Sequence, residues 1–220
     1  MKKLTDFIIE YPNVLDPELC QEIIDRFNVD DRAMPGLTFG GPVGAWKKSK
    51  DLNITHHKDW KDIDDIMFNA LAPKLNEYMK KVCNDFKNYS RIDEVIDTGY
   101  QVQRTDKGEY YKWHTDFGVA GAPGEGYILY RHFTYLFYLN DNFEGGHTQF
   151  FGGDEHDIIP ETGKLLMFPA NPFWVHQGQE VTEGSKYVIT GWVMSNIPCP
   201  PLPWYIHYGD LESWNNFYSY

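Results

Sequence analysis

From about residue 95 onward, the chain is a series of short segments rich in β-branched and aromatic residues. The two longest are "YILYRHFTYLFYLND" and "SKYVITGWVMS", and "HTQFF", "HDIIP" and "GKLLMFP" are shorter. Gly, Pro, Asp and Asn separate them, so each segment predicts a strand bounded by turns. Many short strands with regular turns are typical of an all-β barrel or sandwich. We therefore expect a β core of the jelly-roll kind over residues 95–195.

The N-terminal part of the chain predicts helices instead. "NVLDPELCQEIIDRF" has Asp16 as a candidate cap, Pro17 at the first helical position, and apolar residues on one face. A second helix is expected from about Trp60 to Phe86, kinked or divided by Pro73. Residues 34–45 are rich in glycine and proline and predict a loop.

These expectations give one domain, 1–220, that is mainly β with N-terminal helices. Residues 1–90 form a helical support region, residues 95–195 form the core, and residues 196–220 form an aromatic C-terminal extension. The extension is expected to pack over the barrel; a dimer contact or a role in substrate binding are the alternatives.

Charge and cysteine content limit the partners of the protein. The formal net charge is -12, which argues against a nucleic-acid partner, because such proteins usually carry a basic surface. Lys47, Lys48 and Lys50 are expected on a solvated loop face. The three cysteines are far apart and form no CxxC motif, which favours a reducing, cytoplasmic location. No apolar run has the length of a membrane helix or a signal-peptide core, so no membrane partner is expected.

The stretch "KWHTDFG" places His114 and Asp116 two residues apart. Alternate side chains of a strand point to the same face, so both could bind one ion. His176 in "FWVHQGQEV" is the best third ligand. Two histidines and one carboxylate form the facial triad of non-haem Fe(II) oxygenases, which leaves positions open for a cosubstrate and dioxygen. The alternative is an ordinary surface or core histidine beside an acid.

Ten residues after His176, Lys186 begins an apolar strand. A lysine that points into such a core needs an anionic partner, because an unpaired buried ammonium is costly. A dicarboxylate cosubstrate would supply this partner. The alternative places Lys186 at the strand edge, facing solvent.

Together with "RHFTYLFYLND" and "GGHTQF" between them, these motifs resemble the Fe(II)- and 2-oxoglutarate-dependent dioxygenases of the prolyl 4-hydroxylase-like group. The resemblance covers about residues 95–195 and implies a double-stranded β-helix, or jelly-roll, core. It implies that His114, Asp116 and His176 bind Fe(II) and carry catalysis. It also implies that Lys186 pairs with the distal carboxylate of 2-oxoglutarate.

Three further residues match positions around the cosubstrate in this family. Tyr138 would hydrogen-bond the same carboxylate, and Thr190 and Trp192 would line the pocket. Ordinary core packing is the alternative for each of the three.

The sequence departs from the family pattern at two positions. Relatives often have a tyrosine in a YxxG motif before HxD, where this chain has Thr105 in "TDKG". Gln103, Tyr110 or Tyr111 could compensate, or the pocket is differently polar there. The second departure is His147, which stands where relatives usually have an acidic residue and is expected to be a structural turn residue.

The resemblance implies hydroxylation of an unactivated C–H bond, with 2-oxoglutarate and O2 as cosubstrates, L-ascorbate as a reductant, and release of succinate and CO2. A prolyl residue in a peptide or protein is the leading substrate. The alternatives are a free amino acid or small metabolite, or a catalytically inactive jelly-roll that binds metal or a small ligand. Retention of all four key residues favours the enzyme.

On the substrate side, residues 118–127 are rich in glycine and predict either a mobile lid or a static loop. Arg131 and Trp113 are expected to line this side of the site.

Overall fold

The computed structural model of the chain describes residues 3–38, 45–83, 95–120, 129–152 and 156–195. Most of the expected lid and the whole C-terminal extension lie outside these residues. Within them, no helix combines the length and the apolar character that crossing a membrane requires.

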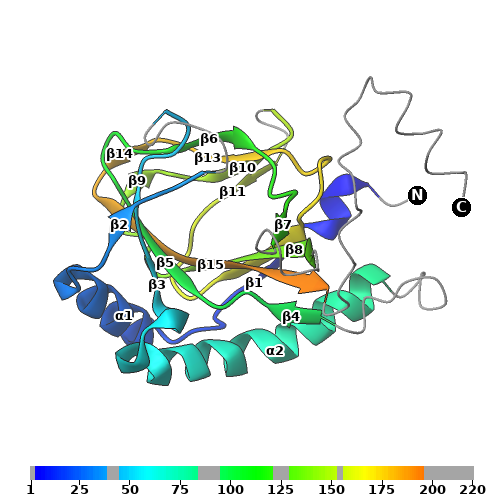
Figure 1. Cartoon of the computed structure of the whole chain (residues 1–220). Coiled ribbons are helices and arrows are strands. Elements are labelled where there is room, and N and C mark those ends of the chain that lie inside the picture. The colour runs from blue at the N-terminus through cyan, green and yellow to red at the C-terminus, as the bar shows by residue number, and fades with distance from the viewer. Residues whose placement is uncertain (1–2, 39–44, 84–94, 121–128, 153–155, 196–220) are drawn as a thin grey trace, which may run out of the picture.

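Two antiparallel sheets form the core, as the jelly-roll prediction required (Figure 1). In the larger sheet, seven strands follow one another as β1 (Ile9–Tyr11), β12 (Leu165–Pro169), β8 (Leu129–Tyr138), β15 (Ser185–Ser195), β5 (Gln101–Asp106), β3 (Lys50–Asn53) and β2 (Met34–Pro35). Two short strands extend it: β4 (Val95–Asp97) pairs with β15, and β7 (Val119–Ala120) pairs with β8.

The smaller sheet has the order β11 (His156–Ile158), β10 (Thr148–Phe150), β13 (His176–Gly178) and β6 (Tyr111–His114). A two-stranded ribbon, β14 (Val181–Glu183) with β9 (Glu144–Gly145), lies at one end of the core. Figure 1 shows the smaller sheet facing one side of the larger sheet, with both long helices against the other side.

The first helix, α1 (Pro17–Val29), confirms the helix predicted here. Pro17 occupies its first turn, and its buried face is Cys20, Ile23, Ile24 and Phe27. The predicted side-chain cap was wrong: Asp16 makes no capping hydrogen bond through its carboxylate, and its carbonyl accepts a bond from the Cys20 N–H at 3.0 Å.

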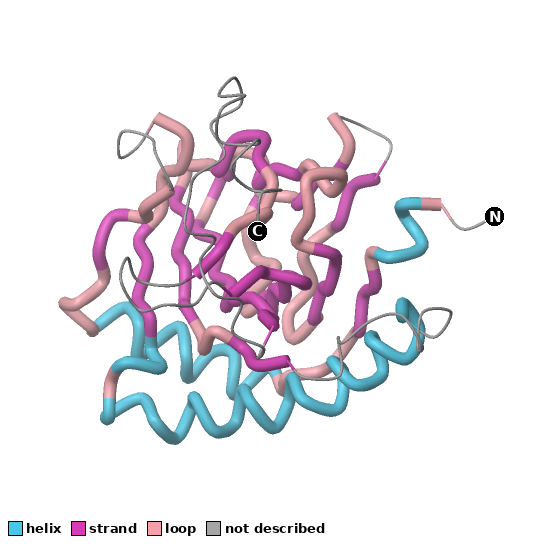
Figure 2. The backbone as a smooth tube through the Cα atoms, turned by 45° about the vertical axis from the view of Figure 1, so that its right-hand side comes forward, coloured by secondary structure: helices cyan, strands magenta, loops and turns pink. Residues whose placement is uncertain are grey.

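The second helix, α2 (Lys61–Cys83), runs without a break through Pro73. Of the two expectations for Pro73, the division into two helices was wrong, and the kink stays a prediction. Its core side is Ile63, Met67, Leu71, Tyr78 and Val82, at spacings of four or seven residues. Ile66 is 41% exposed and lies off this face. Figure 2 shows both helices running beneath the strands, while the first 3-10 turn, Leu4–Phe7, lies beside the strands near the N-terminus. Two further 3-10 turns, Ile54–His56 and Lys58–Trp60, precede α2.

The N-terminal region contributes strands as well as helices. β1 pairs with β12, and β2 and β3 extend the far edge of the larger sheet. Met34–Pro35, expected in a loop, is β2; residues 39–44 of that expected loop lie outside the described residues.

The larger sheet is buried on both faces because each face has its own layer. Leu165 and Met167 of β12 belong to the cluster packed with the helices, whereas Leu166 and Phe168 belong to the cluster between the two sheets. All five residues of β12 are buried, which explains why "LLMFP" shows no polar alternation. The space between the sheets is where the functional site lies.

Candidate metal centre

His114, Asp116 and His176 converge between the two sheets. His114 is the last residue of β6 and His176 is the first residue of β13, and the two are paired across the ladder of the smaller sheet. The ligand atoms of the three residues all lie within 4.8 Å of one another. Among the described residues this is the one group of three or more His, Cys, Asp or Glu side chains that could hold a metal ion.

Asp116 reaches the site by a different route from the one expected. β6 ends at His114, so Asp116 does not share a strand face with it. Instead, the Thr134 hydroxyl of β8 donates a hydrogen bond to Asp116 Oδ2 at 2.7 Å. The carboxylate is therefore attached to the larger sheet, while both imidazoles belong to the smaller one.

Backbone carbonyls orient both imidazoles. His114 Nδ1 lies 2.7 Å from the Lys112 carbonyl, and His176 Nδ1 lies 3.0 Å from the Trp174 carbonyl. Each Nδ1 must carry the proton to donate, which leaves the lone pair on Nε2. The two Nε2 atoms are each 3.6 Å from a different oxygen of Asp116. Outer hydrogen bonds of this kind are what fixes the ring orientation of metal-binding histidines.

The charge states suit a cation. Burial lowers the pKa of His176 to about 4, although Asp116 opposes the shift, so its imidazole is neutral at pH 7. Burial acts to raise the pKa of Asp116, but the two imidazoles and the Thr134 hydroxyl outweigh it and hold that pKa below its usual range. The site therefore presents the neutral imidazole of His176 and the carboxylate of Asp116, both in the form that binds a divalent metal.

Aromatic rings confine the two imidazoles. The Tyr111 ring stacks on His114, with centroids 3.5 Å apart and an interplanar angle of 13°. Phe168 and Phe150 pack on His176 at centroid distances of 4.8 Å and 5.5 Å.

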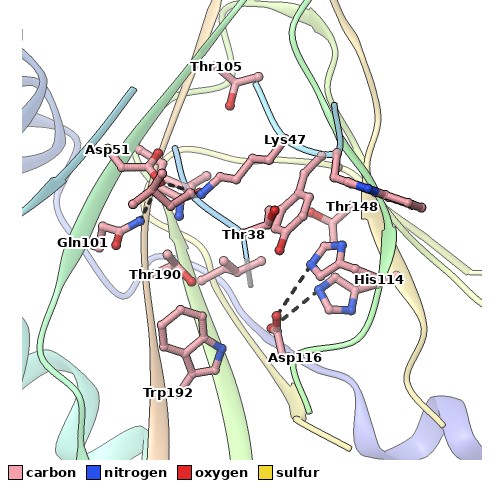
Figure 3. A pocket seen from close by; sticks show the side chains of 18 of the residues that line it. Thr38, Lys47, Asp51, Gln101, Thr105, His114, Asp116, Thr148, Thr190 and Trp192 are labelled. Carbon is pink, nitrogen blue, oxygen red and sulfur yellow. Dashed lines mark hydrogen bonds and ion pairs between the residues drawn. The ribbon is translucent and has the colours of Figure 1, made fainter. Parts of the chain in front are cut away.

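The three residues line a cavity of about 1030 Å³ (Figure 3). Lys186, Thr148 and Leu136 also line it. In Figure 3, Thr190 and Trp192 of β15 lie on the wall opposite His114. Four exposed apolar side chains also line it, namely Met34, Leu37, Trp46 and Phe117.

Lys186 is buried in this cavity rather than facing solvent. Its ammonium donates a hydrogen bond to the Gly146 carbonyl at 2.5 Å and lies 5.5 Å from the centre of the Tyr138 ring. In the described part of the chain no carboxylate lies within ion-pair distance of it, and burial lowers its pKa to about 8. A buried ammonium beside a metal site, without an anion of its own, fits a cosubstrate that carries a second carboxylate.

The other predicted site residues fall into two groups. Thr190, Trp192 and Arg131 line the cavity, whereas Tyr138 and Trp113 do not. Tyr138 is fully buried, and its hydroxyl donates to the Thr148 Oγ1 at 2.8 Å, so Thr148 stands between it and the cavity. The placement of Trp113 on the substrate side and the contact of Tyr138 with the cosubstrate therefore stay predictions.

Thr105 lines the cavity at the position where relatives often have tyrosine. Three residues could compensate for the missing tyrosine, and two of them, Gln103 and Tyr111, also line the cavity. The third, Tyr110, does not line it, and the ammonium groups of Lys48 and Lys112 lie over its ring. His147 is paired with Asp157 at 2.9 Å and has no part in the cavity wall, in keeping with a structural role.

Sequence reasoning missed a buried ion pair in the cavity wall. Lys47, expected on a solvated loop face, is buried and lies 2.6 Å from Asp51 Oδ2. Ser49 and Gln101 donate further hydrogen bonds to the same carboxylate at 2.7 Å and 2.9 Å. The spacing of Lys47, Ser49 and Asp51, alternating along an extended segment, was the available signal. Thr134 and Thr148 were also missed, since each is an ordinary strand residue in the sequence.

Comparison with known proteins finds similarity to 2OG-Fe(II) oxygenases and prolyl hydroxylases. Residues 100–194 match the family model of the 2OG-Fe(II) oxygenase superfamily. The "Putative prolyl 4-hydroxylase" of Acanthamoeba polyphaga mimivirus is 26% identical over 192 residues, which cover 82% of this chain and 71% of that protein. A PKHD-type hydroxylase of Janthinobacterium sp. (strain Marseille) is 28% identical over 99 residues, which cover 43% of this chain and 42% of that protein.

Solved structures share the fold. A prolyl hydroxylase from Trichoplax adhaerens, in complex with a hypoxia inducible factor oxygen degradation domain peptide fragment, superposes with a TM-score of 0.65 at 18% identity and covers 87% of this chain and 84% of that one. A viral collagen prolyl hydroxylase from Paramecium Bursaria Chlorella virus-1, in its 2OG complex, gives a TM-score of 0.59 at 18% identity, covering 87% and 97%. A prolyl-4-hydroxylase from Pseudomonas putida gives 0.60 at 15% identity, covering 88% and 95%.

Proposed function

We propose that this chain, a prolyl 4-hydroxylase-like 2OG-Fe(II) oxygenase and so a dioxygenase enzyme, hydroxylates a prolyl residue in a peptide or protein. Succinate and CO2 are the expected coproducts, and L-ascorbate is the expected reductant. One observation carries the proposal: a His-Asp-His triad shares a cavity with a buried lysine that has no anionic partner among the described residues.

The proposed metal ligands are His114 Nε2, His176 Nε2 and one oxygen of Asp116. Fe(II) bound there would supply the activation of O2, coupled to oxidative decarboxylation of 2-oxoglutarate. The chain's own part is to orient both imidazoles through the carbonyls of Lys112 and Trp174. Thr134 keeps the carboxylate aimed between them.

Lys186 is the proposed partner of the distal carboxylate of 2-oxoglutarate. Lys186 lines the cavity, and among the described residues its ammonium makes one hydrogen bond, to the Gly146 carbonyl. The Thr148 hydroxyl, which accepts from Tyr138, can donate to the same carboxylate. Tyr138 would thus act on the cosubstrate through Thr148.

The walls of the cavity keep bulk water from the reacting atoms. Phe150 and Phe168 close the space behind His176, and Leu136 and Val188 of the larger sheet face the same cavity. Exclusion of water strengthens the ionic contacts of the carboxylates and limits side reactions.

A peptide substrate agrees with the size and rim of the cavity. At about 1030 Å³ it lies at the upper end of the range for small-molecule sites, so it has room for a substrate segment beside 2-oxoglutarate. Leu37, Trp46 and Phe117 leave an exposed apolar rim, which a peptide can cover and a free amino acid cannot. The Trichoplax relative was solved with a peptide, which supports the same substrate class here.

Succinate formation tests this proposal. The protein is incubated anaerobically with Fe(II) and 2-oxoglutarate and then exposed to air, with and without proline-containing peptides. We expect succinate to rise with a peptide, and mass spectrometry to show one added oxygen atom on its proline.

Asp116→Ala should abolish both signals, whereas the matched variant Asp157→Ala, which removes a carboxylate outside the cavity wall, should retain them. Succinate that never depends on any peptide would contradict the prolyl substrate. Failure to bind Fe(II) and 2-oxoglutarate at all would contradict the enzyme.

A further inference from the structure

A smaller chamber of about 190 Å³ adjoins the main cavity. Asn53, Gln101, Arg131, Thr190 and Trp192 line both spaces, so the two share a wall. The remaining lining residues of the chamber are Thr98, Gly99, Gly191 and Met194. The chamber has the volume of a single side chain rather than of a whole cosubstrate.

Unpaired polar atoms gather around this chamber. In the described part of the chain, five buried side-chain polar atoms have no hydrogen-bond partner, and three of them are Asn53 Oδ1, Arg131 Nε and Trp192 Nε1. Buried polar groups are nearly always paired, and leaving one unpaired is costly. Three such atoms on residues that line one chamber point to a ligand that pairs with them.

Two of the shared-wall residues, Arg131 and Trp192, are held in place by contacts within the chamber lining. The Arg131 guanidinium lies 3.5 Å from the centre of a Trp192 ring, and the Trp192 backbone N–H donates to Thr98 Oγ1 at 3.0 Å. No carboxylate of the described residues lies within ion-pair distance of Arg131. Gln101 differs from the others because its amide already donates to Asp51.

We propose that the chamber binds a primary carboxamide, the end group of an asparagine or glutamine side chain of the substrate. Its carbonyl oxygen would accept from Arg131 Nε and Trp192 Nε1, and its N–H would donate to Asn53 Oδ1. A carboxylate would satisfy the two donors but would face the Asn53 oxygen, and an ammonium would face two donors. The inference deepens the proposed function, since it places a glutamine or asparagine beside the hydroxylated residue. It rests on the proposed function in one respect, that the substrate is a peptide.

Small probes can test the chamber without any turnover. Butyramide, butyrate and 2-pentanone have the same length but different polar groups. Butyramide offers both a hydrogen-bond donor and an acceptor, butyrate offers a charged acceptor, and 2-pentanone offers a neutral acceptor alone. Binding to the full chain is followed by the NMR signal of the Trp192 indole N–H, which is identified by its loss in Trp192→Phe. We expect butyramide to shift this signal saturably and to bind roughly fivefold or more tightly than the other two, as the gain of one hydrogen bond predicts.

Variants of Asn53 locate the contact. Asn53→Leu should reduce butyramide to the affinity of 2-pentanone, because the acceptor is gone, and should leave 2-pentanone unchanged. Thr105→Val, in the main cavity but not the chamber, should leave all three affinities unchanged. If Asn53→Leu unfolds, Asn53→Asp is used instead; its carboxylate should pair with Arg131 and weaken butyramide selectively.

Butyrate binding as tightly as butyramide would overturn the proposal, and so would the absence of a saturable shift with any probe. In a second arm, proline peptides carrying Gln, Glu or Met next to the proline are compared for hydroxylation. The Gln peptide should be preferred, and the preference should vanish in Asn53→Leu. If butyramide binds but no prolyl peptide is hydroxylated, the chamber assignment stands and only the prolyl substrate is rejected. If peptides are hydroxylated without any preference for an amide side chain, the prolyl substrate stands and the chamber assignment is rejected.

Discussion

Asp116 owes its position to one hydroxyl group rather than to the strand that carries His114. The Thr134 hydroxyl donates to Asp116 Oδ2 across the space between the sheets, and that carboxylate is buried. A carboxylate held by a single neutral donor is free to rotate once the donor is removed. Thr134 is therefore a positioning residue whose effect on the metal can be measured.

Thr134→Val keeps the shape of the side chain and removes the hydroxyl. We expect metal affinity to fall by about 10-fold to 100-fold, the usual range for loss of an outer hydrogen bond to a ligand. Titration calorimetry with Fe(II) under anaerobic conditions measures it. Thr182→Val on the exposed β14 strand is the matched control and should bind metal normally; equal affinity in both variants would contradict the role of Thr134.

Lys186 makes the stability of the protein depend on pH. Burial lowers its pKa from 10.5 to about 8, so between these values the folded state is deprotonated while the unfolded state still binds a proton. Stability therefore rises as pH increases through this window, by roughly 3 kcal/mol in total according to linkage. Urea unfolding between pH 7.5 and 10, without cosubstrate, measures this for the protein and for Lys186→Met. The free energy of unfolding should rise with pH in the protein and not in Lys186→Met. The same pH dependence in both proteins would contradict the role of Lys186.

The residue scale also shows what the sequence could and could not reveal. The spacing of His114, Asp116, His176 and Lys186 sufficed to predict their convergence, because the resemblance links these positions to one cavity. The Lys47–Asp51 pair was not foreseen, because a lysine run in the sequence usually lies on a solvated face, and the alternation of Lys47, Ser49 and Asp51 was not taken into account. Burial of Lys47 depends on Asp51, Ser49 and Gln101 meeting in three dimensions.

At the scale of elements, α2 continues through Pro73 where the sequence favoured a kink or a division. Proline removes one backbone hydrogen bond, which leaves the carbonyl of Asn69 without its helical partner. Pro73 and Asn69 are both exposed, so water can take that place. The break was predicted from local chemistry alone, and packing of the buried face against the larger sheet overrides it.

The two faces of α2 allow a matched comparison within one helix turn. Ile63 is 1% exposed and Ile66 is 41% exposed. We expect Ile63→Ala to lower the free energy of unfolding by about 2–4 kcal/mol, because it leaves a cavity in the core. Ile66→Ala should change it by less than about 1 kcal/mol. Urea denaturation measures both, and equal losses would show that the helix presents a different face to the sheet.

The strands were the more predictable elements. β8 and β15 coincide with the two longest β-branched and aromatic segments, since both strands are buried by layers on each side. β1, β2 and β3 were missed because they are short and lie among helices and turns in the sequence. Their strand character comes from pairing, of β1 with β12, of β3 with β5 and of β2 with β3, which a local sequence pattern cannot show.

At the scale of the whole molecule, the metal site joins the two sheets. The imidazoles belong to β6 and β13, and the carboxylate is attached to β8 through Thr134. A ligand that binds only the folded state stabilises it by mass action, by about 2.7 kcal/mol at one hundred times the dissociation constant. The intact triad should therefore be visible in thermal unfolding.

Addition of Fe(II) and 2-oxoglutarate under anaerobic conditions should raise the unfolding temperature of the protein, and chelation should reverse the rise. Asp116→Ala should abolish it, because two imidazoles alone bind weakly. Differential scanning calorimetry measures the shift. An unchanged temperature at saturating ligand, or an equal rise in Asp116→Ala, would contradict the assignment of the triad.

The place of β15 in the strand order has a consequence for synthesis on the ribosome. β15 lies between β8 and β5, yet it is the last described strand to leave the exit tunnel. Until it emerges, β8 and β5 each present an unpaired strand edge. The nascent chain must therefore hold two incomplete half-sheets apart from each other and from neighbouring chains, a state prone to aggregation that chaperones recognise. A stop codon just before Ser185 would leave that state permanent, so such a product should be cleared rather than accumulate as a folded fragment.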